Sequence, residues 1–164
     1  MADRQRSRVY EAENLVHRLL DRSVDHPVVE IAGSRLTLPP ERRFADIASV
    51  QTYLDRVLGL DWIRRSWPRA ADPVRVRERA GGARAHYERA GATIAVPTHR
   101  TGGGWALREL VVLHELAHHL APDDEVPHGG PFVGRLLDLV DGVVGPEAAL
   151  LLRITMLDTG VRIG

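Results

Sequence analysis

The sequence predicts an α+β fold in which a small, mostly antiparallel sheet packs against a buried helix, with further helices toward both ends of the chain. Hydrophobic residues recur at helical spacing in several stretches and at alternating positions in one, residues 74–97. At 164 residues, with 44% hydrophobic and 27% charged residues, the chain is expected to form a single domain, residues 1–164, with its own core.

Helical periodicity predicts helices both before and after the alternating stretch. They span residues 3–22, 45–58, 105–120, 131–140 and 146–157. Gly59 follows the second of them, as is typical of a helix end, and Pro131 and Pro146 stand in the first turns of the last two. Residues 28–38 are expected to form one short extended segment.

The alternating stretch predicts three short strands. Gly81-Gly82 and residues 88–91 supply the turns between them. Residues 93–96 are expected at the rim of a cleft, where an extended peptide could pair by strand addition. The Thr-Gly-Gly-Gly run at 101–104 then predicts a flexible loop.

Composition excludes several classes of protein. The chain contains no Cys, which rules out disulfides and thiolate metal sites, so a transition metal would need His and carboxylate ligands. No apolar run approaches the about 20 residues that span a bilayer. The first eight residues are polar and Arg-rich, unlike a secretory signal. We therefore expect a cytoplasmic protein with no membrane partner.

The motif with the clearest chemical meaning is H-E-L-A-H at residues 114–118, which has the H-E-x-x-H pattern. Residues four apart lie one above the other on a helix, so His114 and His118 can bind one ion at about 2.0–2.1 Å each. Glu115 is rotated about 100° from His114 and would lie beside the ion as a general base. The pattern predicts a zinc-dependent hydrolase.

The setting of the motif supports this interpretation. The helix around it is apolar on nearly all sides, which predicts that it is buried. Two imidazoles and a carboxylate are costly to bury without a partner, and a metal ion is the most economical one. Pro122 disfavours helix at the residue before it, so the helix is expected to end near Leu120.

A third ligand is expected from the chain downstream of the motif. His128 is favoured because it precedes a predicted helix and is followed by two glycines that let the backbone turn closely. Asp124 and Glu147 are the alternatives. His119 is about 140° from His114 around the helix, which predicts a structural role in place of metal binding.

These residues resemble a known group of enzymes. Residues 113–121, LHELAHHLA, followed by H-G-G-P-F at 128–132 and an apolar helix, resemble the zincin metallopeptidases. They look in particular like a family of small actinobacterial metallohydrolases, and the later H-G-x-x-F is similar to SprT-like peptidases. The resemblance covers roughly residues 105–140. It implies zinc on His114, His118 and His128, with Glu115 catalytic, in a metallopeptidase (protease) that acts on a peptide or protein.

Two side chains are candidates for stabilising an oxyanion, a group that such a reaction usually needs. Tyr87 and His99 lie at or near the ends of predicted strands, from which they could reach the metal.

Two other classes of function compete with the hydrolase. A catalytically inactive metal-binding or partner-binding module could keep the same scaffold without turnover. The second competing class is nucleic-acid binding, because arginines and aromatic rings can stack on bases. The candidate residues are Trp62, Trp67 and Arg64-Arg65. The formal net charge of +0 argues against nucleic acid.

Overall fold

The computed structural model describes residues 2–82, 84–99 and 105–164, and the loop predicted at 101–104 lies outside these residues. The chain divides into two compact units, one formed by residues 1–41 and 124–164 and the other by residues 42–123. The expectation of a single domain stays a prediction. The α+β class is confirmed, because helices and two small sheets coexist.

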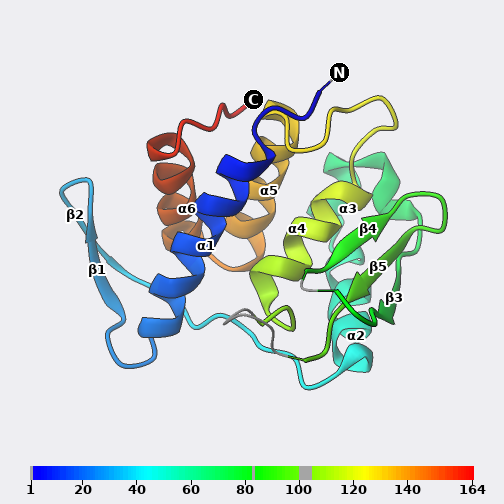
Figure 1. The fold of residues 1–164 in the computed structure, drawn as a ribbon, viewed down its shortest axis with the longest axis horizontal. Coiled ribbons are helices and arrows are strands. Elements are labelled where there is room, and N and C mark those ends of the chain that lie inside the picture. The colour runs from blue at the N-terminus through cyan, green and yellow to red at the C-terminus, as the bar shows by residue number, and fades with distance from the viewer. Residues whose placement is uncertain (1, 83, 100–104) are drawn as a thin grey trace. The chain divides into compact units, whose positions relative to one another are not determined.

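The first unit is built mainly from helices. Its elements are α1 (Arg6–Arg22), β1 (Val28–Ile31), β2 (Ser34–Thr37), α5 (Gly130–Val143) and α6 (Pro146–Asp158). Helix α6 packs against both α1 and α5, as Figure 1 shows. The core lies where their apolar faces meet, and it includes the fully buried side chains Val9, Val16, Phe132, Leu139 and Leu152. The predicted helices at 3–22, 131–140 and 146–157 are confirmed, with shifts at their ends.

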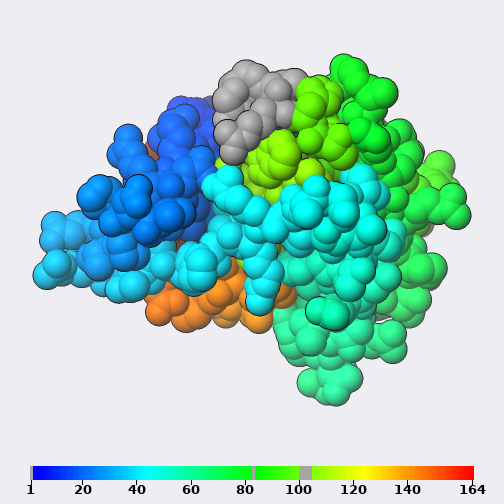
Figure 2. All heavy atoms as spheres, turned by 90° about the horizontal axis from the view of Figure 1, so that it is seen from below, coloured from blue at the N-terminus to red at the C-terminus, as the bar shows by residue number. Residues whose placement is uncertain are grey.

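The segment predicted as a single extended stretch is a β-hairpin. Strands β1 and β2 pair antiparallel, with Val28 opposite Thr37 and Ile31 opposite Ser34. The turn between them places Ala32 at φ 48° and Gly33 at φ 78°, the left-handed pair that a two-residue hairpin turn requires. The sequence concealed this turn because Ala occupies a position usually taken by Asn, Asp or Gly. The hairpin protrudes from the helices of its unit and is exposed in the space-filling view (Figure 2).

The second unit contains a three-stranded sheet and the helix that carries the motif. Its elements are α2 (Ile47–Leu58), α3 (Asp61–Ser66), the 3₁₀ helix η1 (Pro68–Ala71), β3 (Arg75–Glu78), β4 (His86–Glu88), β5 (Thr93–Val96) and α4 (Glu109–His119). Helix α2 packs against β3, and α4 packs against β4. The Asp46 carboxylate accepts a hydrogen bond from the Ser49 amide at 2.8 Å and so caps the start of α2. Helices α3 and η1 were not predicted.

The three predicted strands are confirmed, but the sheet that they form is mixed. The order is β3-β5-β4, with β3 parallel and β4 antiparallel to β5. A tight turn joins β4 to β5, which makes that pair antiparallel. Strand β4 lies on the side of β5 opposite β3 and runs antiparallel to β5, so the chain that turns back from β4 into β5 runs in the same direction as β3. The prediction of a mostly antiparallel sheet was therefore wrong for this sheet.

Helix α4 begins four residues later than predicted. The chain before it is extended, because the Phe44 amide donates to the Leu107 carbonyl and the Glu109 amide donates to the Arg42 carbonyl, each at 2.9 Å. These long-range bonds compete with the helical ones that residues 105–108 would otherwise make. The side chain of Glu109 is fully buried and accepts hydrogen bonds from Arg42 and from the Tyr53 hydroxyl. Among the described helices, none is long and apolar enough to cross a membrane.

Candidate metal centre

The H-E-x-x-H motif lies on α4, as its spacing predicts. The helix ends at His119 with Leu120 as its cap residue, just before Pro122. His114 is 2% exposed and Glu115 is 4% exposed, whereas His118 is half-buried. The ring centroids of His114 and His118 are 5.0 Å apart, so the two imidazoles are neighbours one turn apart.

The described part of the chain contains one group of three side chains with the spacing of metal ligands. It consists of His114, His118 and His128, whose ring nitrogens lie within 4.8 Å of one another. Asp124 and Glu147, the alternative third ligands, are both exposed and are not members of this group. Among the three candidates for the third ligand, His128 is the one that belongs to this group.

The first unit holds His128 tightly. The residue is 5% exposed, and its Nδ1 atom is 2.7 Å from a carboxylate oxygen of Asp3. Its ring lies between Tyr10 and Phe132, with centroid distances of 5.4 Å and 5.0 Å. Gly129 follows it, and a Cβ there would come within 3.1 Å of the Val126 carbonyl oxygen. A glycine at this position therefore avoids a tight contact with the backbone of the preceding turn.

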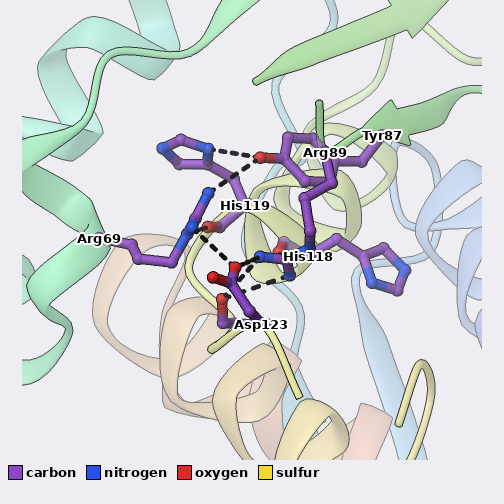
Figure 3. A network of polar contacts seen from close by, with 7 residues as sticks. Arg69, Tyr87, Arg89, His118, His119 and Asp123 are labelled. Atoms are coloured by element: carbon purple, nitrogen blue, oxygen red, sulfur yellow. Dashed lines mark hydrogen bonds and ion pairs between the residues drawn. The ribbon is translucent and has the colours of Figure 1, made fainter. Parts of the chain in front are cut away.

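Two arginines cap the last turn of α4 (Figure 3). Arg89 donates to the carbonyls of His118 and Ala121 at 3.2 Å each, and Arg69 donates to the carbonyl of His119 at 2.8 Å. The Asp123 carboxylate bridges both guanidinium groups, at 2.8 Å from Arg89 and 3.2 Å from Arg69. Cations at a helix C-terminus satisfy its last carbonyls and stabilise its dipole. The end of the helix that carries His118 is therefore fixed.

His119 has the structural role that its position on the helix predicts. Figure 3 shows its ring and that of His118 pointing in different directions from α4. Its Nε2 atom is 2.9 Å from the Asp72 carbonyl oxygen, which can only accept, so Nε2 carries the proton. Nδ1 then accepts from the Tyr87 hydroxyl at 3.0 Å. Burial lowers the pKa of His119, and the hydrogen bond to Asp72 opposes that effect only in part.

The two candidates for oxyanion stabilisation lie in different surroundings. Tyr87 on β4 directs its hydroxyl to His119. His99 is exposed in the loop after β5. The roles of both residues in catalysis stay predictions. Residues 93–96 cannot accept an added strand, because β5 is the central strand and is paired on both sides; the outer strands of the described sheet are β3 and β4.

The Arg-aromatic cluster proposed for nucleic acid is partly assembled. The rings of Trp62 and Trp67 meet edge to face with centroids 5.8 Å apart. The Arg64 Nε atom donates to the Leu58 carbonyl at 3.1 Å, so this guanidinium is engaged by the backbone of its own unit. The prediction that nucleic acid is not a partner stays a prediction.

Sequence reasoning missed the residues that surround the candidate ligands. The sequence places Asp3 and Gln5 only in a polar N-terminal segment, yet both bond to His128. No motif in the sequence marks Arg69 or Arg89. No local pattern could have found them, because each acts on a residue at least 29 positions away. Comparison of the chain with models of known protein families, with curated proteins and with solved structures found no match in any of the three.

Proposed function

We propose that this protein is a zinc-dependent hydrolase, and most simply a metallopeptidase. One observation carries the proposal: three imidazoles with ring nitrogens within 4.8 Å of one another, and a buried carboxylate, Glu115, directly after the first of them on α4. Three histidines leave the fourth position of a tetrahedral zinc open for water or substrate, which is the pattern of catalytic sites in contrast to structural ones.

The donor set fits zinc. A tetrahedral zinc ion with bonds of about 2.0–2.1 Å separates its nitrogen ligands by about 3.3–3.4 Å. The ring nitrogens of His114, His118 and His128 lie within 4.8 Å of one another, a range that includes this separation. Zinc is one of the metals that neutral imidazole binds well. The chain has no Cys that could bind the ion in place of these histidines.

Glu115 would transfer the proton during hydrolysis. Bound zinc would supply Lewis acidity to a carbonyl and lower the pKa of water toward about 7. Glu115 would accept a proton from the attacking water and deliver it to the leaving amine. Its place on the helix favours this role, because Glu115 directly follows His114 on α4 and is 4% exposed.

A peptide substrate is supported by the sheet beside α4. Strand β4 packs against α4 and, within the described residues, pairs on one side only, with β5. An extended chain can add to such an outer strand through backbone hydrogen bonds. This replaces β5 as the strand expected to hold the substrate.

The test combines metal analysis with hydrolysis. The full chain, loaded with Zn²⁺ and dialysed, is expected to hold about one zinc per chain by mass spectrometry of the metal. His114→Ala and His128→Ala should lose the ion, whereas Asp124→Ala and the exposed His99→Ala should keep it. Circular dichroism shows whether each variant is folded. A wild-type protein that retains no zinc would overturn the proposal.

Glu115→Gln separates binding from chemistry. This variant should keep zinc and lose hydrolysis of a mixed peptide library by at least about 100-fold, because the general base is gone. Glu11→Gln makes the same change on the exposed face of α1 and should leave hydrolysis unchanged. Zinc binding without hydrolysis in the wild type would instead favour the inactive metal-binding module.

A further inference from the structure

The backbone at His128 has a conformation that other residues must hold in place. Its φ is 58°, in the left-handed region that a β-carbon makes unfavourable. The Gln5 side-chain amide donates to the His128 carbonyl at 2.8 Å. The same amide exchanges hydrogen bonds with the backbone of Arg162, donating to its carbonyl at 3.0 Å and accepting from its amide at 3.1 Å. Gln5 therefore fastens the His128 backbone to the C-terminal segment.

The ring of His128 is held by a second residue of the same short segment. The Asp3 carboxylate lies 2.7 Å from Nδ1 of His128. An ionised carboxylate has no proton to give, so Nδ1 must carry the proton in this hydrogen bond. The lone pair of the imidazole is then on Nε2, and a metal would bind there. The rings of Tyr10 and Phe132 restrict rotation about the side chain.

We infer that Asp3 is a positioning residue for the metal: its carboxylate selects the Nδ1-protonated form of His128 and aims Nε2 at the ion. This inference rests on the proposed function. A carboxylate behind a metal-binding histidine fixes the orientation of the ring and raises its basicity, and its removal typically costs 10–100-fold in metal affinity. Asp3 is 125 positions from His128 in the sequence, so the N-terminal segment becomes part of the metal centre.

A series of substitutions at Asp3 tests the inference with Zn²⁺ alone. Affinity is measured by competition with a chromophoric chelator. Asp3→Ala should bind zinc about 10–100-fold more weakly than the wild type. Asp3→Asn keeps an oxygen acceptor but loses the charge, so its affinity should fall between the two. Asp25→Asn, an exposed residue of the same unit, is the matched control and should bind like the wild type.

Nitrogen-15 NMR of the metal-free protein shows which ring nitrogen of His128 carries the proton. This would not change if Asp3 only stabilised the fold. The His128 ring should be protonated at Nδ1 in the wild type and in Asp3→Asn, and should shift toward Nε2 protonation in Asp3→Ala. If wild type binds zinc through His128 but Asp3→Ala has the same affinity and the same ring protonation, the inference is overturned and the proposed function stands. A wild type that binds no zinc overturns the proposed function as well.

Discussion

The Tyr87 hydroxyl donates a hydrogen bond of 3.0 Å to Nδ1 of His119, a histidine with no exposed surface. This bond joins β4 to the last residue of α4, directly beside the candidate ligand His118. Arg69 also approaches the Tyr87 hydroxyl, at 3.5 Å. The Tyr87 hydroxyl therefore has a structural partner in His119, and its role in stabilising an oxyanion stays a prediction.

Replacing Tyr87 by Phe should affect stability more than turnover. The change leaves the buried Nδ1 of His119 without its donor, and we expect the free energy of unfolding to fall by about 1–3 kcal/mol. Urea denaturation measures this loss. Hydrolysis per bound zinc should stay close to the wild-type value, because the hydroxyl faces His119. A drop of about 100-fold in turnover with unchanged stability would instead identify Tyr87 as the oxyanion stabiliser.

The stability of the metal-free protein should depend on pH through His119. Burial lowers the pKa of His119 in the folded state, whereas the unfolded chain binds the proton at an ordinary pKa of about 6.5. As the pH falls from about 6.5 toward the lower folded-state pKa, the unfolded state takes up the proton first and the free energy of unfolding decreases. Above about 6.5 both states are neutral and this contribution is constant.

The variant His119→Gln isolates that contribution, because glutamine is polar but does not titrate. The wild type should lose more stability than His119→Gln between neutral and mildly acidic pH, as measured by denaturation at each pH. Subtracting the two curves removes the titration of the other histidines. Parallel curves would show that His119 does not contribute to the pH dependence.

Removing the arginine cap should loosen the last turn of α4. Arg89→Ala loses the hydrogen bonds to the carbonyls of His118 and Ala121, and we expect a loss of about 1 kcal/mol in stability. Amide hydrogen exchange should become faster in residues 118–121. Arg89→Lys keeps the charge but cannot reach both carbonyls with a planar fork, so its effect should be intermediate. Arg65→Ala, an exposed residue of α3, should leave exchange in α4 unchanged.

Chelation should lower the melting temperature of the zinc-loaded protein. A metal that binds only the folded state stabilises it by about 2.7 kcal/mol when its free concentration is 100 times Kd. EDTA should therefore shift the thermal transition of the wild type downward, and added Zn²⁺ should restore it. His114→Ala should show no shift on either addition. An equal shift in both proteins would mean that the stabilising ion binds elsewhere.

Short-range features of this protein follow from residue spacing alone. The period of 3.6 places His114 and His118 on one face of α4 and turns His119 away, and the structure agrees on both points. Pro122 ends the helix because it disfavours helix at the residue before it. Alternating apolar positions likewise identify all three strands of the sheet. In each case the deciding interaction joins residues only a few positions apart.

Distant contacts decided the rest, because nothing in a local pattern records which segment will supply a partner. Pairing with residues 42–44 delays the start of α4 until Glu109, overriding the helical tendency of residues 105–108. The direction of β3 relative to β5 depends on the path of the connection between them. Asp3 and His128 are 125 positions apart and come together only when the chain folds. Their contact depends on the packing of α1 against α6 and on the C-terminal segment, which Gln5 binds.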